Sequence, residues 1–309
     1  MSQTSSSSRA SVAATLIGLT AVLMWATLGL FTAASGAVPP FLMNALCFAF
    51  SGTLALIVVR LRSGSFKALR QPLAPWLVGV LGLFGFHFLY FTSLRNAPPV
   101  EANLINYLWP LLIVLFSGLL PGERLRWFHL AGAGLGLVGA ALLVTRGQGL
   151  DLDPRYAFGY GVAILSALTW SSYSVISRRF GSVPTDAVAG FCLATAVLSA
   201  LCHLALEETV WPATPGQWAA VLALGAFPVG AAFFTWDYGL KRGNIQVLGA
   251  AAYLAPLLST LLLIAFGYGA FTWPVAAACI LITVGAVVAA QEMIFRRGRK
   301  VAEPAPRTR

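Results

Sequence analysis

Charged residues are scarce in this sequence. Only 10% of its 309 residues are Asp, Glu, Lys or Arg, whereas a soluble domain carries about 25%. Hydrophobic residues make up 58% of the chain, and the mean hydropathy is +0.80. These values exclude an ordinary water-soluble domain and indicate a protein whose surface faces lipid.

Residues suited to metal, nucleotide or proteolytic chemistry are also few. All 4 cysteines lie inside apolar segments without metal-ligand spacing, so we interpret them as small packing residues. The sequence has neither a His-Glu-x-x-His zinc motif nor a Gly-x-x-x-x-Gly-Lys nucleotide loop. Asp237 lies four residues before Lys241, which favours a local ion pair over a catalytic acid. We therefore expect no enzyme activity, no metal and no cofactor.

Apolar segments of about 20 residues, the length that crosses a bilayer as a helix, follow one another along the chain. They are apolar all round rather than alternating, which favours helices over a β-barrel. The sequence therefore predicts an all-α integral membrane protein with ten transmembrane helices. The predicted spans are 12–34, 40–59, 72–94, 98–120, 125–145, 156–177, 185–206, 217–240, 244–266 and 271–292.

The basic residues indicate an orientation. A net charge of +10 could suggest nucleic acid, but these residues lie between the apolar segments and in the C-terminal tail, so we expect no nucleic-acid partner. Basic loops mark the cytoplasmic side. With the N-terminus inside, all of the 20 Lys and Arg residues except Arg95, Arg146 and Arg155 are cytoplasmic. This predicts cytoplasmic tails at 1–11 and 293–309 and an external linker at 146–155.

The second half of the chain repeats features of the first. The sequence Tyr-Leu-Trp-Pro-Leu-Leu at 107–112 recurs as Tyr-Leu-Ala-Pro-Leu-Leu at 253–258, 146 positions later, and Trp127 matches Trp273 at the same shift. Trp25 matches Trp170 at a shift of 145. Five helices per repeat is an odd number, so the two copies, 12–145 and 156–292, would be inverted around a central cavity. Chance alignment of apolar helices is the alternative.

These features resemble the drug/metabolite transporter superfamily over nearly the whole chain. The resemblance rests on ten helices in two repeats, on Trp25 and Trp170, and on Asn-x-x-Asn-Tyr-x-Trp-Pro at 103–110. Within that superfamily, the mid-membrane aromatic residues resemble those of the bacterial aromatic amino-acid exporters. The resemblance implies a multi-pass protein of the bacterial inner membrane that carries a small molecule through the lipid bilayer, and a monomer would suffice.

Three tryptophans lie at an unusual depth. Tryptophan normally sits at the membrane interface, as Trp76 and Trp218 near helix starts would. Trp25, Trp109 and Trp170 lie about 11–14 residues into their helices, which is mid-bilayer at roughly 1.5 Å per residue. We predict that they converge on one substrate cavity; the alternative is that they are packing anchors between helices.

Polar residues inside the apolar segments are the other candidates for substrate binding. His87 and Tyr90 lie one turn apart, and a mid-membrane histidine could bind a carboxylate, act as a gate or accept a proton. The alternative is a neutral histidine bonded to a neighbouring helix. Asparagine amides can pair with both charges of a zwitterion or join helices. The asparagines of this set are Asn44, Asn103 and Asn106.

Two repeat-related prolines complete the candidate site. Pro110 and Pro256 each remove a main-chain donor in mid-helix, and the resulting kink and free carbonyls suit a helix that lines a cavity. Simple kinks without a binding role are the alternative. We include Tyr253, three residues before Pro256, among the substrate-binding candidates.

The sequence thus predicts a secondary transporter that exports aromatic amino acids or similar amphiphilic metabolites by alternating access. No carboxylate lies at the midplane of the predicted helices, which favours a uniporter or an exchanger over an acid-based proton relay. The alternatives are an exporter of drugs or other metabolites, and a membrane enzyme or scaffold that transports nothing.

Overall fold

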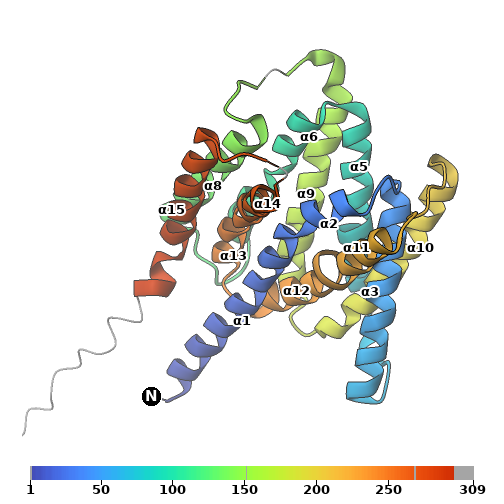
Figure 1. Cartoon of the computed structure of the whole chain (residues 1–309). Helices are drawn as coiled ribbons and strands as arrows, with labels where there is room; N and C mark the ends of the chain where they lie inside the picture. The colour runs from blue at the N-terminus through green and yellow to red at the C-terminus, as the bar shows by residue number, and fades with distance from the viewer. Residues whose placement is uncertain (1, 151, 268, 296–309) are drawn as a thin grey trace, which may run out of the picture.

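The structure is a computed structural model that describes residues 2–150, 152–267 and 269–295. These residues are helical or loop, with no β-strand among them, which confirms the all-α prediction (Figure 1). Within the described residues, nine helices are long and apolar enough to cross a membrane, and they coincide with nine of the predicted segments. The remaining segment, 156–177, is also helical, but it is more polar because it carries several serines.

The first half of the chain forms eight α-helices. They are α1 (Ser2–Ala26), α2 (Leu28–Ala34), α3 (Pro40–Ser63), α4 (Leu73–Val80), α5 (Phe86–Asn96), α6 (Pro99–Asn106), α7 (Trp109–Ser117) and α8 (Trp127–Thr145). The second half forms seven, which are α9 (Ala157–Arg179), α10 (Val188–Leu206), α11 (Pro215–Ala226), α12 (Ala232–Arg242), α13 (Ile245–Ala251), α14 (Leu254–Ala265) and α15 (Trp273–Phe295). Short 3-10 turns η1 (Lys67–Leu69), η3 (Pro154–Tyr156) and η4 (Thr185–Ala187) lie between them.

Two of the predicted spans contain a π-helical turn at their centre. The turn η2 (Leu81–Gly85) joins α4 to α5, and η5 (Phe227–Ala231) joins α11 to α12. The two turns are 146 positions apart, which is the shift of the sequence repeat. A π turn misaligns the main-chain hydrogen bonds of a helix and is frequent at functional sites.

Two other spans break before a proline. The helix of the fourth span stops at Asn106 and restarts at Trp109, next to Pro110. The helix of the ninth span stops at Ala251 and restarts at Leu254, two residues before Pro256. Proline cannot donate to the preceding turn and clashes with its carbonyl, so the main chain is interrupted at matching places in the two halves.

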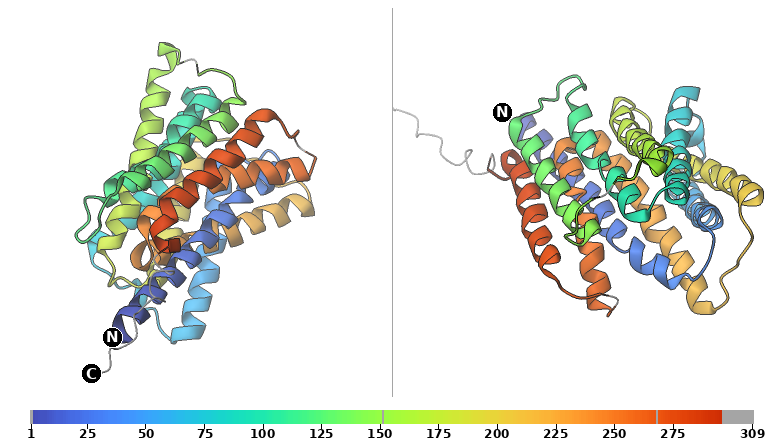
Figure 2. Two further views of the ribbon diagram at one scale, coloured as in Figure 1. Left: turned by 90° about the vertical axis from the view of Figure 1, so that its left-hand side faces the viewer. Right: turned by 90° about the horizontal axis from the view of Figure 1, so that it is seen from above.

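The helices pack in pairs that correspond between the halves. α8 packs along α15 on one side of the molecule and α3 along α10 on the other, with the remaining helices between (Figure 2). In the centre, α9 packs against α5, α6 and α7, and α1 packs against α12, α13 and α14. We call α5, α6, α7 and α9 the first bundle, and α1, α12, α13 and α14 the second bundle.

The helices of the two bundles pack against each other at one end. α7 packs against α13, and α9 packs against α12, at the end of the molecule where α1 begins. We call this end, the lower one in Figure 1, the N-terminal face. At the opposite face, the corresponding pairs α14 with α6 and α2 with α5 do not pack closely in the described part of the chain. The bundles are therefore closed against each other at the N-terminal face and separated at the opposite one.

Small residues allow the closest helix pairs to form. A Cβ atom added to Gly132 in α8 would lie 2.5 Å from the carbonyl oxygen of Gly285 in α15. One added to Gly239 in α12 would lie 2.6 Å from Cα of Gly18 in α1. Larger side chains would separate these helices, so the glycines fix their distance.

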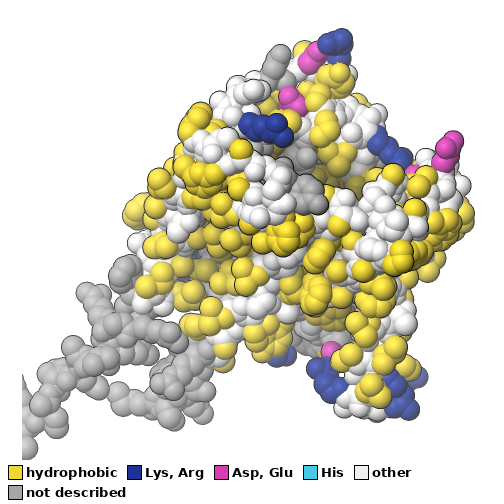
Figure 3. Space-filling view, viewed as in Figure 1, with side chains coloured by type: hydrophobic (Ala, Val, Ile, Leu, Met, Phe, Trp, Pro, Cys, Tyr) yellow, Lys and Arg dark blue, Asp and Glu magenta, His cyan; other side chains and the backbone are white. Residues whose placement is uncertain are grey.

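The outer surface is apolar around its middle. Side chains such as Leu201, 57% exposed, and Ile280, 65% exposed, point outward. Hydrophobic side chains cover the middle of the molecule, and charged ones gather toward its upper and lower ends (Figure 3). A water-soluble monomer rarely exposes so large an apolar patch, so this surface fits a lipid environment.

The structure describes the predicted tails and linker only in part. Helix α1 begins at Ser2, so most of the segment predicted as a tail, 1–11, continues the first helix. Residues 296–309 of the predicted basic tail lie outside the described residues, as does residue 151 of the predicted linker. Elsewhere in that linker, α8 ends at Thr145, where Arg146 takes a left-handed conformation, and η3 begins at Pro154.

Candidate functional site

The three mid-membrane tryptophans come together between the bundles. The ring centroids of Trp25 and Trp109 are 6.0 Å apart, those of Trp25 and Trp170 also 6.0 Å, and those of Trp109 and Trp170 6.3 Å. All three pairs are edge-to-face, the arrangement in which the positive edge of one ring meets the negative face of another. The helices α1, α7 and α9 thus place one indole each at a common point.

A fourth tryptophan, which the sequence analysis missed, belongs to the same group. The ring of Trp236 in α12 lies 5.0 Å from that of Trp25 and 6.1 Å from that of Trp109. The repeat offered a signal for it, since Trp236 is 146 positions after Tyr90. We call Trp25, Trp109, Trp170 and Trp236 the tryptophan cluster.

Burial separates the members of the cluster. Trp109 is 8% exposed, Trp170 is 3% exposed and Trp236 is fully buried, so these three rings mainly pack against protein. Trp25 is only partly buried, and its indole N–H donates to the carbonyl of Pro228 in η5 at 3.1 Å. Trp25 is therefore the member best placed to meet a ligand.

His87 lies beside the tryptophan cluster in an aromatic cage. Its ring is 5.1 Å from Phe86, 5.3 Å from Phe48 and 6.2 Å from Phe233. Its Nδ1 atom lies 2.7 Å from the carbonyl oxygen of Leu83 in η2. Because a carbonyl can only accept, Nδ1 carries the proton. His87 thus donates to a carbonyl of the π turn η2, and Trp25 donates to a carbonyl of the π turn η5.

The tyrosine and asparagine candidates are hydrogen-bonded to one another or to neighbouring helices. The hydroxyl of Tyr90 donates to Oδ1 of Asn103, and the Asn103 amide donates to the carbonyl of Pro99 at 2.8 Å. Asn106 accepts from the hydroxyl of Ser166 in α9 at 3.2 Å. The first bundle therefore presents a polar strip next to the aromatic rings.

Asn44 lies away from this strip. It is buried between α3 and α10, where its amide donates to the hydroxyl of Ser199 at 2.8 Å. This bond joins two helices that lie outside the two bundles.

Tyr253 connects the two helix breaks. Its hydroxyl donates to the carbonyl of Tyr107 at 2.9 Å, and its side chain is fully buried. The ring packs against Gly136 so closely that a Cβ there would lie 2.4 Å from it. The two prolines therefore stand beside a joined pair of breaks near the centre of the molecule.

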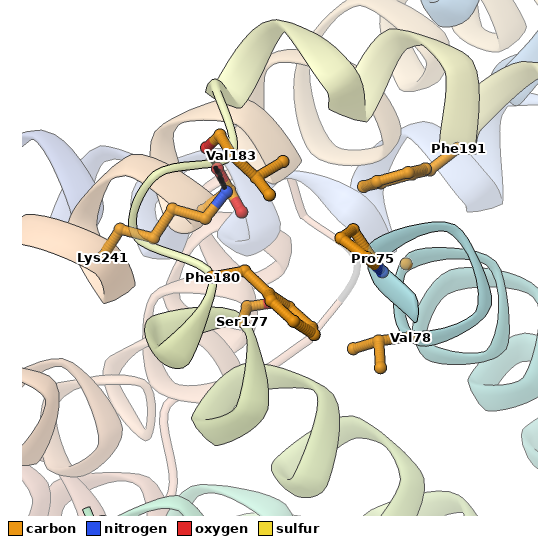
Figure 4. Close-up of a pocket in the computed structure, with 9 residues that line it drawn as sticks. Pro75, Val78, Ser177, Phe180, Val183, Phe191 and Lys241 are labelled. Atoms are coloured by element: carbon orange, nitrogen blue, oxygen red, sulfur yellow. Dashed lines mark hydrogen bonds and ion pairs between the residues drawn. The ribbon is translucent and has the colours of Figure 1, made fainter. Parts of the chain in front are cut away.

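One cavity lies beside the helix breaks and a second near the N-terminal face. One of about 160 Å³ is bounded by Tyr107, Leu143, Val144, Pro256, Ser259 and Thr260. A cavity of about 150 Å³ can hold a benzene ring, so this space suits a small aromatic group. The second, about 10 Å³, lies near the N-terminal face (Figure 4) and has room for about a single water.

The small cavity borders the ion pair that the sequence predicted. Nζ of Lys241 lies 2.8 Å from the Asp237 carboxylate, and both side chains are nearly buried. The hydroxyl of Thr185 donates to the same carboxylate at 2.7 Å. The carboxylate is thus neutralised locally.

The comparison with known proteins identifies the family. Residues 12–145 and residues 157–291 each match the EamA-like transporter family. The chain belongs to this family. The resemblance to drug/metabolite transporters is confirmed, and the chain is a multi-pass membrane transporter rather than an enzyme.

Relatives of known name support this assignment. The chain is 54% identical over 277 residues to the aromatic amino acid exporter YddG of Ancylobacter novellus, with 89% of this chain and 96% of that protein covered. It is 28% identical to the YddG of Escherichia coli, over 81% of this chain and 87% of that protein. A solved crystal structure that is 53% identical, and covers 90% of this chain and 97% of its own, has a TM-score of 0.87.

Proposed function

We propose that this transporter exports aromatic amino acids, or amphiphilic metabolites of similar size, from the bacterial cytoplasm by alternating access. The observation that carries the proposal is the tryptophan cluster, where indoles from both bundles meet beside His87 and the polar strip of Tyr90 and Asn103. Aromatic rings offer stacking to an aromatic side chain, and neutral polar groups offer hydrogen bonds to a zwitterionic backbone. The relatives named as aromatic amino acid exporters support the same substrate class.

The proposed architecture is ten membrane helices in two inverted repeats, with α9 as the sixth helix. The π turns and the breaks before prolines occupy matching positions in the two halves. The contacts of α9 with α5 and α7 correspond to those of α1 with α12 and α14. The first helix of each half thus packs against helices of the other half. A two-fold axis that lies in the membrane plane would produce this arrangement.

The N-terminal face is proposed to be the cytoplasmic one, with both termini inside and the protein in the inner membrane. The N-terminal face carries basic residues at the ends of α3, α9 and α12, among them Arg62, Arg178 and Arg242. Positive residues in short loops are retained on the cytoplasmic side. In this orientation, the bundles are closed toward the cytoplasm and separated toward the outside.

The transport mode is proposed to be uniport or exchange by a single chain. Asp237 is already paired with Lys241, and Phe86 and Phe233, which pack against the tryptophan cluster, are neutral. The aromatic rings around His87 and the polar strip of Tyr90 and Asn103 are neutral, which favours transport without an acid-based proton relay.

Release of amino acids from intact cells tests the proposal. Cells that produce the transporter are expected to release more phenylalanine, tyrosine and tryptophan than cells with a Trp25→Ala variant of equal expression. A Trp218→Ala variant is the control, because Trp218 is exposed near the start of α11, where its ring stacks on Trp211. Equal release by all three strains, or selective release of aliphatic amino acids, would reject the proposed substrate.

A further inference from the structure

A charged network joins the two bundles at the N-terminal face. Nη1 of Arg178, at the end of α9, donates to the carbonyls of Leu240 at 2.5 Å and Gly243 at 2.9 Å. Its Nη2 forms an ion pair with Glu123, in the loop between α7 and α8. The other carboxylate oxygen of Glu123 accepts from the amide of Gln246 in α13 at 3.0 Å. We call Arg178, Glu123 and Gln246 the latch.

Each end of the latch belongs to a different bundle. Arg178 closes the first bundle, and Glu123 follows α7 of the same bundle. Gln246 and the two carbonyls belong to the second bundle or to its α12–α13 turn. Separation of the bundles at this face therefore breaks every one of these bonds except the ion pair itself.

The environment makes these bonds strong. The side chains of Arg178 and Glu123 are 22% and 20% exposed, and Gln246 is buried. The guanidinium caps carbonyls at the C-terminal end of α12, where the helix has no internal donors left and carries partial negative charge. If Arg178 is removed, the Glu123 carboxylate loses its ion pair but keeps the bond from Gln246, and the two carbonyls lose this donor.

The repeat provides no such network at the opposite face. At the shift of 145, Arg178 corresponds to Ala33, and at the shift of 146, Glu123 corresponds to Gly269 and Gln246 to Val100. None of these three residues can form an ion pair or a side-chain hydrogen bond. These described positions therefore cannot form an equivalent of the latch at the opposite face.

We propose that the latch biases the transporter toward the state that is closed to the cytoplasm, and that its opening is part of the step in which substrate enters. The proposal rests on the alternating-access mechanism put forward above. The cytoplasm-open state must break the bonds of the latch, whereas the outward-open state breaks nothing equivalent. The resting transporter therefore faces outward, and weakening of the latch shifts it toward the cytoplasm-open state.

Distance measurement between the bundles tests the latch without substrate. Spin labels are attached through Ala13→Cys in α1 and Ser182→Cys after α9, both exposed, in a chain whose four native cysteines are replaced. Pulsed electron resonance in lipid nanodiscs then gives the populations of short and long distances. Arg178→Ala is expected to raise the ratio of long to short about tenfold, the effect of a lost charge-assisted bond.

The adjacent arginine is a matched control. Arg179 donates to the carbonyl of Leu119, which follows α7, so its bond does not reach the second bundle. Arg179→Ala removes the same charge one position away and should leave the populations unchanged. Glu123→Gln and Gln246→Ala should each raise the ratio of long to short distances less than Arg178→Ala does. These two variants test the latch if Arg178→Ala does not fold.

The results separate the latch from the transport proposal. Unchanged distances in Arg178→Ala, Glu123→Gln and Gln246→Ala, or an equal shift in Arg179→Ala, overturn the latch even if the transporter exports aromatic amino acids. Absence of flux in the unaltered protein, with the expected distance changes, instead rejects the proposed substrate and leaves the latch supported.

Discussion

The hydroxyl of Tyr253 donates a hydrogen bond to the main-chain carbonyl of Tyr107, and these two residues are 146 positions apart, the shift of the internal repeat. Each tyrosine lies at the break of its helix, just before a proline. The bond therefore joins equivalent points of the two halves, one in each bundle. This contact therefore links the two helix breaks directly.

Removal of the Tyr253 hydroxyl should lower the stability of the folded protein. Tyr253→Phe keeps the ring against Gly136 but leaves the Tyr107 carbonyl without this donor, which typically costs about 1–3 kcal/mol. A lower melting temperature in detergent is the expected result. Tyr238→Phe is the comparison, because the Tyr238 ring lies under the guanidinium of Arg242 and that contact remains. Equal melting temperatures for both variants would remove the proposed importance of the bond.

Substrate affinity should depend on Trp25 more than on other tryptophans. An aromatic pair contributes about 0.5–1.5 kcal/mol beyond area burial, and 1.4 kcal/mol is tenfold in affinity. Trp25→Ala is thus expected to weaken phenylalanine binding about two- to tenfold, as measured by titration calorimetry in detergent. Trp218→Ala, at the surface, should bind as the unaltered protein does. Equal affinities in the two variants would mean that the cluster only packs helices.

Trp236 should matter for stability instead. Its ring is fully buried and its N–H donates to Ser174 at 3.3 Å. A large-to-small change at such a site typically costs about 3–5 kcal/mol, because a cavity remains. Trp236→Ala is expected to unfold at a much lower temperature than Trp25→Ala. The reverse order would show that the packing around these two rings has been misassigned.

The Asp237–Lys241 pair should be structural rather than a coupling site. Loss of one partner leaves the other charge buried and typically costs about 3–5 kcal/mol, so Asp237→Ala should express poorly. The double change Asp237→Asn with Lys241→Gln should recover stability. Its flux in liposomes should respond to a pH gradient as the unaltered protein does. A pH response that disappears only in the double variant would assign proton coupling to this pair.

Cysteine labelling in intact cells should find the N-terminal face inside. Lys67→Cys, in the turn after α3, is expected to resist an impermeant reagent, and Glu208→Cys, after α10, is expected to react with it. Both positions are exposed, so access depends on the side of the membrane alone. The opposite labelling pattern would invert the proposed topology.

The sequence predicted helix positions well because a lipid-facing helix must be apolar all round and about 20 residues long. It did not predict the π turns at Leu81 and Phe227. Their sequences, Leu-Gly-Leu-Phe-Gly and Phe-Pro-Val-Gly-Ala, contain glycine or proline, but such residues mark a weak point in a helix without specifying a π turn. The early start of α1 was also missed, because serine is a weak helix former and that stretch lacks an apolar pattern.

The candidate site was predicted in part. Depth along the helix was enough to select Trp25, Trp109 and Trp170, but it cannot tell which way a ring points. Trp236 was overlooked even though the repeat pairs it with Tyr90, and Asn44 proved to be bonded to a helix away from the cluster. The latch could not be foreseen, because Glu123, Arg178 and Gln246 are far apart in sequence and meet only through the packing of their helices.

Counterflow in liposomes that contain only the purified protein tests the central claim most directly. Liposomes loaded with unlabelled phenylalanine should accumulate labelled phenylalanine transiently, and an excess of tryptophan outside should compete, whereas lysine should not. Trp25→Ala should reduce this accumulation, and Trp218→Ala should not. Accumulation equal to that of empty liposomes, or equal competition by lysine, would contradict the account of an aromatic amino-acid exporter that works by alternating access.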